Sequence, residues 1–122
     1  MTEASPSTPP ADKPVYKRVL LKISGEAFCK PGSFGIDGHE LEVIAGEIAA
    51  AAKVGAELAV VVGGGNIIRG EKLSKEGHIN QATADYMGML GTVINGLALK
   101  ELLEKPGPPA RALSANTLSA VA

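Results

Sequence analysis

A run of three glycines, Gly63–Gly65, follows the apolar residues Val60–Val62, and Arg69 stands four residues further along the chain. Because glycine has no Cβ atom, successive backbone N–H groups in such a run can turn toward one anion, and phosphate is the commonest guest. The arginine guanidinium adds a forked donor that suits two phosphate oxygens. The stretch therefore indicates a phosphate-binding turn, and the alternative is a tight turn that needs glycine only for its backbone.

Lys22 is a second candidate cation, and it stands beside Ser24 and Gly25 at the end of another apolar run. If the two runs are neighbouring parallel strands, Lys22 and the triple glycine would face the same crevice. A lysine there binds phosphate as a point charge, whereas the simpler interpretation is a solvated lysine at a strand end. Neither G-x-x-x-x-G-K-[ST] nor G-x-G-x-x-G is present, the latter because position 68 is isoleucine.

The other polar candidates have weaker patterns. Asp85 stands at the start of a predicted helix, where a carboxylate either caps the helix or accepts hydrogen bonds from sugar hydroxyls. His39 and His78 lack metal-ligand spacing, so no metal site is predicted. Cys29 is the only cysteine, and it has no evident activating neighbour, so no role is assigned to it.

Five elements are expected to position these residues, and hydrophobic patterns, capping signals and glycines define them. They are a strand over 16–24, a helix over 37–54, a strand over 57–62, a helix over 82–104 and a strand over 110–115. The apolar runs in the strands are typical of strands buried on both faces. This β-α-β-α-β order implies a parallel sheet and an α/β fold, although two helices would cover only one face of the sheet well.

Composition limits the class of protein. The chain has 122 residues, of which 45% are hydrophobic and 20% charged, as in one soluble domain or part of one. A net charge of -1 does not point to nucleic acid or to a membrane surface, and no apolar run is long enough to span a membrane. A single cysteine fits a reducing compartment. Residues 1–14 are expected to be a disordered tail, and residues 15–122 the folded part.

Four segments together resemble the bacterial uridylate (UMP) kinases of the amino acid kinase superfamily. They run collinearly from Pro14 to about Leu99 and read PVYKRVLLKISGEAF, FGID, VVVGGGNIIRG and DYMGMLGTVINGLAL. The resemblance implies a parallel-sheet sandwich of the amino acid kinase (carbamate kinase-like) type. It covers only the front part of that fold, so the C-terminal nucleotide-binding half would be absent.

The resemblance implies transfer of the γ-phosphoryl group of ATP to UMP, with Mg²⁺, in pyrimidine nucleotide biosynthesis. By matching position, Lys22 and Arg69 would be catalytic. The residues that would bind ATP are Lys22, Ile23, Ser24, Gly25, Gly65 and Arg69, and those that would bind UMP are Gly64 and Asp85. The loop associated with GTP regulation would be Lys30, Pro31, Gly32, Ser33, Phe34 and Gly35.

The resemblance further implies a cytoplasmic homohexamer that is activated by GTP and inhibited by UTP, without nucleic-acid or membrane partners. Without the C-terminal half, the 122 residues are expected to bind nucleotide weakly and not to turn over. Two alternatives remain open: another phosphotransferase of the superfamily, and a noncatalytic nucleotide-binding or oligomerisation module. Asp85 followed by Met87-Gly88-Met89 argues against the first of these.

Overall fold

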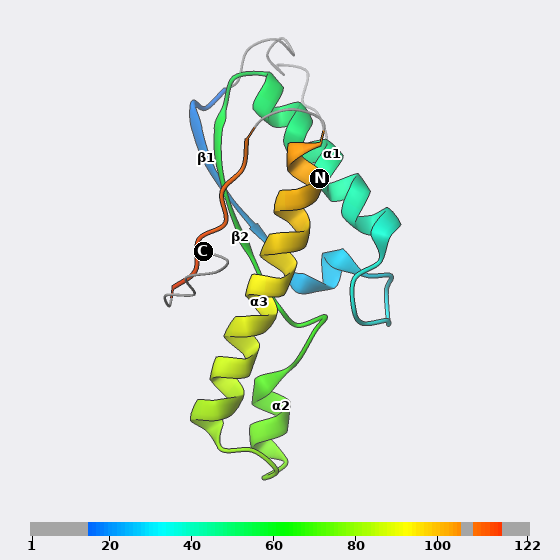
Figure 1. Ribbon diagram of the computed structural model, residues 1–122, viewed down its shortest axis with the longest axis vertical. Helices are drawn as coiled ribbons and strands as arrows, with labels where there is room; N and C mark the ends of the chain where they lie inside the picture. Colours follow the sequence, from blue (N-terminus) through cyan, green and yellow to red (C-terminus); the bar gives the residue numbers. More distant parts are fainter. Residues whose placement is uncertain (1–14, 106–108, 116–122) are drawn as a thin grey trace.

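The computed structural model describes residues 15–105 and 109–115 (Figure 1). The predicted tail, residues 1–14, lies outside the described residues. The elements in chain order are β1 (Arg18–Ile23), the 3₁₀ helix η1 (Gly25–Phe28), α1 (Gly38–Lys53), β2 (Glu57–Val62), α2 (Gly70–Lys75) and α3 (Gln81–Glu104).

The two strands are parallel neighbours, as the sequence predicts. Their register runs from Arg18 opposite Glu57 to Ile23 opposite Val62, so both strands end at the same edge of the sheet. The N–H of Gly63 donates to the Ile23 carbonyl at 2.9 Å and extends the pairing one residue further. The segments that follow the two strands therefore start side by side, which is the arrangement that an open α/β sheet needs for a ligand site.

The predicted third strand, residues 110–115, is not formed. In the described part of the chain the sheet has two strands, and residues 109–115 (orange in Figure 1) are irregular. An extended segment becomes a strand only where a neighbouring backbone supplies its hydrogen bonds. Here the N–H of Ala110 instead donates to the Glu104 carboxylate at 3.3 Å.

The core lies on one face of the sheet. It is built around the buried Phe28 of η1 and around apolar residues of α1 and α3, against which the inward-facing strand residues pack. The buried members of this cluster are Phe28, Leu41, Ala45, Ile48 and Leu99. Packing in this core therefore holds the two strands against α1 and α3.

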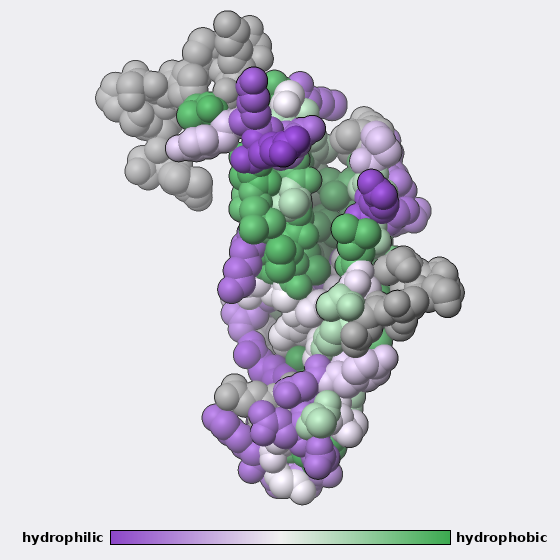
Figure 2. Space-filling view, turned by 90° about the vertical axis from the view of Figure 1, so that its left-hand side faces the viewer, coloured by the Kyte–Doolittle hydropathy of each residue, from purple (hydrophilic) through white to green (hydrophobic). Residues whose placement is uncertain are grey.

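The other face of the sheet is uncovered, so the prediction of strands buried on both faces is wrong for the described residues. Burial alternates along both strands, and the outward side chains include Leu20, which is 69% exposed, and Val61, which is 50% exposed. Figure 2, turned to the side of the molecule on which the strands lie, shows a broad hydrophobic area. The expectation that the helices cover only one face well is confirmed.

Helix α1 begins where the sequence predicts. The Asp37 carboxylate accepts a hydrogen bond from the Glu40 N–H at 3.1 Å, which satisfies one of the free donors at the helix start. The helix ends at Lys53, and Gly55 then has a φ of 111°, a conformation that favours glycine. The hydrogen bond to Glu40 holds the pKa of Asp37 below its ordinary value, and the charge of Lys30 also lowers it.

This cap predicts a pH dependence of stability. Because the folded-state pKa of Asp37 is lowered, its contribution is present above the unfolded-state pKa and is lost as pH falls through the folded-state pKa. Asp37→Asn keeps a capping oxygen but removes the titration. Urea unfolding should therefore show a stability difference between the original chain and the variant that shrinks as pH falls through the acidic range below the ordinary aspartate pKa. A difference that stays constant over this range would contradict the prediction.

Candidate functional site

The segments that follow β1 and β2 touch through their backbones. A Cβ atom built on Gly25 would lie 2.7 Å from the Gly65 nitrogen and 2.6 Å from the Asn66 Oδ1 atom. A Cβ atom on Gly63 would lie 3.0 Å from the Gly25 nitrogen. Glycine is therefore required at position 25 for the two strand ends to meet, and a side chain at position 63 would be tightly packed against Gly25. The structure brings Ser24, Gly25 and the triple glycine together.

Gly64 packs against helix α3. A Cβ atom there would lie 2.8 Å from the Thr92 nitrogen, 3.0 Å from the Gly91 carbonyl carbon and 3.1 Å from the Gly88 oxygen. All three atoms belong to the helix backbone, so they can move only with the helix. The need for glycine at position 64 is thus explained by packing, without any ligand. This supports the tight-turn alternative for Gly64, whereas no such contact accounts for Gly65.

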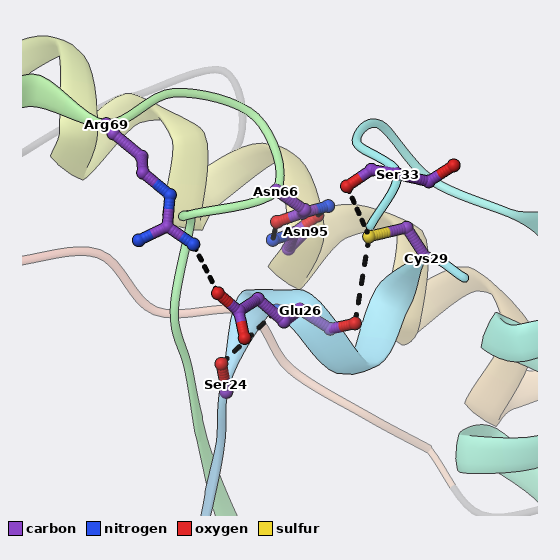
Figure 3. Close-up of polar contacts among 7 residues, drawn as sticks. All are labelled: Ser24, Glu26, Cys29, Ser33, Asn66, Arg69 and Asn95. Atoms are coloured by element: carbon purple, nitrogen blue, oxygen red, sulfur yellow. Dashed lines mark hydrogen bonds and ion pairs between the residues drawn. The ribbon is translucent and has the colours of Figure 1, made fainter. Parts of the chain in front are cut away.

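Arg69 lies beside Gly65, as a phosphate clamp requires. A Cβ atom on Gly65 would be 3.6 Å from the guanidinium carbon, and the guanidinium forms an ion pair with Glu26 of η1 (Figure 3). The side chains of Arg69 and Glu26 are 57% and 67% exposed. An exposed pair of this kind contributes only about 0–1 kcal/mol, so an incoming anion can replace the carboxylate at little cost.

An open cleft of about 830 Å³ lies between the loop Cys29–Phe34, the segment Gly65–Arg69 and α2. Its size is within the range of small-molecule sites. Three cations, Lys30, Arg69 and Lys72, line it together with the carboxylates of Glu26 and Glu76. Five of the six residues predicted to form the GTP loop, Lys30 to Phe34, are in its wall, whereas Lys22 and Asp85 are not.

Lys22 stands at the end of β1, but on the uncovered face of the sheet. Its side chain is exposed, and its register partner on β2 is Val61. The neighbouring Ile23 points to the covered face, since burial alternates along the strand. Lys22 therefore lies on the uncovered side of the sheet, and it is not among the residues that line the cleft with Arg69.

Ser24 caps a helix in the structure, whereas Asp85 does not. The Ser24 Oγ atom accepts a hydrogen bond from the Glu26 N–H at 3.2 Å and so caps η1. The cap of α3 is Asn80, whose Oδ1 atom accepts from the Ala82 N–H at 2.9 Å. Asp85 lies beyond the first turn, so the capping interpretation of Asp85 is wrong. It is exposed on the helix surface, and its predicted contact with the ribose stays a prediction.

Comparison with known proteins places the chain in a family. The profile of the Amino acid kinase family matches residues 17–120. The chain belongs to the amino acid kinase family. Among curated relatives, the uridylate kinase of Bradyrhizobium sp. (strain ORS 278) is 50% identical over 109 residues, which are 89% of this chain and 45% of the relative. That of Rubrobacter xylanophilus is 53% identical over 106 residues, 87% of this chain and 42% of the relative.

Solved structures agree with this assignment. The UMP kinase of Bacillus anthracis matches with a TM-score of 0.66 and 43% identity, over 72% of this chain and 36% of that structure. The UMP kinase of Ureaplasma parvum matches with a TM-score of 0.64 and 39% identity, over 71% and 36%. This amino acid kinase chain therefore spans less than half the length of these relatives. Its α/β architecture with a parallel sheet is confirmed as the N-terminal portion of their fold.

Two buried residues beside the site of this amino acid kinase were not predicted from the sequence, the asparagines Asn66 and Asn95. They form a reciprocal side-chain pair that joins the glycine turn to α3. A signal for Asn95 was present, because it is a polar residue in the middle of the apolar stretch Val93–Leu97. A buried amide must find partners, so it indicates a polar contact inside the fold.

The described residues offer no metal site, and the cysteine has a packing role. No three histidine, cysteine, aspartate or glutamate side chains of the described ranges lie together as a metal site would require. The Cys29 thiol is buried and donates weakly to the carbonyls of Ser33 at 3.4 Å and Glu26 at 3.7 Å, so it packs the cleft loop (Figure 3). No described helix is both long and apolar enough to cross a membrane.

Proposed function

We propose that this amino acid kinase chain is the N-terminal part of a uridylate kinase, which transfers the γ-phosphoryl group of ATP to UMP. The observation that carries the proposal is the meeting of two glycine-bearing strand ends beside the Arg69 guanidinium. The relatives named uridylate kinase support UMP as the acceptor. Transfer to another acceptor of the family is the weaker assignment, because this chain and these uridylate kinases have the same residue at about half of the aligned positions.

In phosphoryl transfer the protein takes little part in covalent chemistry, because most of the catalysis comes from positioning the substrates and from positive charge near the transferred group. The backbone N–H groups of Gly25 and Gly65 would orient phosphate oxygens at the rim of the sheet. Lys22 would stabilise the charge on the transferring group, and Arg69 would leave Glu26 to clamp a phosphate. Mg²⁺ bound with ATP would supply neutralisation of the phosphate charge. The described residues of this chain include no group of three carboxylate, histidine or cysteine side chains that would hold it.

Further parts of the proposal concern ribose recognition and regulation. Asp85 would accept hydrogen bonds from the UMP ribose, and Gly64 would contribute from the glycine turn. GTP would act at the loop Lys30–Gly35, of which all residues but Gly35 line the cleft. UTP would be an inhibitor. The complete enzyme would be a cytoplasmic homohexamer in pyrimidine nucleotide biosynthesis.

A noncatalytic binding or oligomerisation module is the second candidate. The observation in its favour is the uncovered sheet face with Leu20 and Val61, together with Ile94, which is 47% exposed on α3. Such apolar surface is typical of a contact with another part of a protein or with another subunit. The two candidates differ in nucleotide turnover, and this difference decides between them.

The isolated 122 residues are expected to release no ADP from ATP and UMP above background, because they span only 45% and 42% of the two uridylate kinases compared above. Joined to the C-terminal part of the Rubrobacter xylanophilus uridylate kinase, they are expected to give ADP release that depends on UMP. A coupled ADP assay measures both, with CMP in place of UMP as the control. Robust turnover by the isolated chain would contradict the first expectation, and a folded but inactive chimera would contradict the proposed function.

A further inference from the structure

The asparagine pair has a complete and buried set of hydrogen bonds. Asn95 is 0% exposed and Asn66 is 2% exposed. The Asn66 amide donates to the Asn95 Oδ1 atom at 3.1 Å, and the Asn95 amide donates back to the Asn66 Oδ1 atom at 2.6 Å. Figure 3 shows the two side chains lying against each other, beside the ion pair of Glu26 and Arg69. No buried side-chain nitrogen or oxygen of the described residues lacks a partner.

The remaining donors of the pair reach the backbone of two different loops. The Asn95 amide donates to the Gly63 carbonyl at 2.8 Å, in the glycine turn. The Asn66 amide donates to the Gly35 carbonyl at 2.9 Å, at the end of the cleft loop. The Gly35 N–H in turn donates to the Asn66 carbonyl at 2.7 Å. Gly35 has a φ of 82°, which fixes the loop in a conformation that few other residues adopt.

The amides therefore connect three segments that are distant in the sequence. Apart from their mutual contact, both side chains bond to the backbone of the turn or the loop rather than to the helix. An apolar pair would fill the same volume, so burial alone does not explain asparagine at both positions. Hydrogen bonds in a low-dielectric interior are strong and directional, which suits them to fixing the position of a backbone.

We propose that Asn66 and Asn95 are positioning residues that hold the glycine turn and the loop Lys30–Gly35 as one unit. Gly65 of the turn and Lys30–Phe34 of the loop both line the cleft, so a molecule that displaces one of these segments would also displace the other through Asn66. The meaning of this coupling for catalysis rests on the proposed function, because it assumes that the turn binds phosphate. The physical coupling itself does not depend on that assumption.

Amide hydrogen exchange in the 122-residue chain tests the coupling. Asn95→Asp removes the donor to Gly63 and to Asn66 at constant size. The exchange rate at the Gly35 N–H, divided by the rate at the Leu41 N–H of α1, is expected to rise roughly tenfold, because Gly35 opens more often while α1 does not. Leu99→Ala is the matched control, since it destabilises the same helix one turn later without touching the amides. Its ratio is expected to stay unchanged.

A ratio that is unchanged in Asn95→Asp, or raised equally by Leu99→Ala, would overturn the proposal. Should Asn95→Asp not fold, Asn95→Ser replaces it with the same criterion. In the unaltered chain, a titration with UMP provides a second measurement: the Gly35 and Gly65 amide signals are expected to shift with the same half-saturation. A shift at Gly65 alone would overturn the coupling. Absence of any shift would count against the proposed UMP site, and the exchange ratio would then decide the positioning role.

Discussion

Replacing Gly64 by alanine is expected to lower the free energy of unfolding by about 3 kcal/mol, the upper part of the usual range for overpacked cores. The added Cβ atom would lie 2.8–3.1 Å from backbone atoms of Thr92, Gly91 and Gly88. These atoms cannot yield by a side-chain rotation, so α3 has to move away from the glycine turn. Such a movement would also strain the hydrogen bond between Asn95 and Gly63.

Gly96→Ala is the matched control, because a Cβ atom on Gly96 would meet nothing within 4 Å. In the interior of α3, alanine is expected to stabilise by up to about 1 kcal/mol relative to glycine. Urea unfolding followed by circular dichroism measures both variants. The packing explanation of Gly64 would be wrong if Gly64→Ala unfolded at the same urea concentration as Gly96→Ala.

The second large effect concerns Lys22. In the active chimera, Lys22→Ala is expected to reduce kcat by about 10²–10³-fold, the usual loss when one preorganised charge-stabilising group is removed. Its side chain is exposed on the uncovered face of β1, so the change should leave the fold intact. The expected loss lies in kcat rather than in KM, because the ammonium would act on charge that develops during transfer.

Lys17→Ala is the control for this variant, since Lys17 is also exposed but precedes the start of β1, at the opposite end of the strand. Initial rates in the coupled ADP assay give kcat and KM for both variants, and circular dichroism confirms that they fold. If Lys22→Ala kept the kcat of the parent chimera, Lys22 would be a solvated lysine at a strand end. The catalytic assignment would then rest on Arg69 alone.

Much of the fold follows from local signals. The apolar run before the triple glycine gives the bounds of β2, and the Asp37 cap with Gly55 gives those of α1. Helix α2 was missed because it lies in a polar segment and Arg69, at its N-cap, makes no side-chain cap bond. Its position depends on packing against α3, which local sequence does not reveal. The predicted strand over 110–115 is not formed for a similar reason, because a strand needs a neighbouring strand to pair with and local sequence does not reveal one.

The site was predictable in part. The meeting of Gly25 with the triple glycine follows from parallel strands with a common edge, and this was expected from the sequence. The contact of Gly64 with α3 was not, since it joins residues separated by more than twenty positions through their backbones. Lys22 was expected to face the same crevice as the triple glycine, and alternation along β1 places its side chain on the uncovered face of the sheet.

The bare side of the two-stranded sheet has a practical consequence for work with this protein. Leu20 and Val61 present aliphatic groups to water, and among the described residues no third strand pairs with the outer edges of β1 and β2. Surfaces of this kind promote self-association as concentration rises, and they attract chaperones during synthesis. We therefore expect the exposed sheet face, more than the net charge of -1, to control self-association of the isolated chain, and dilute samples are the appropriate choice for the exchange and titration experiments.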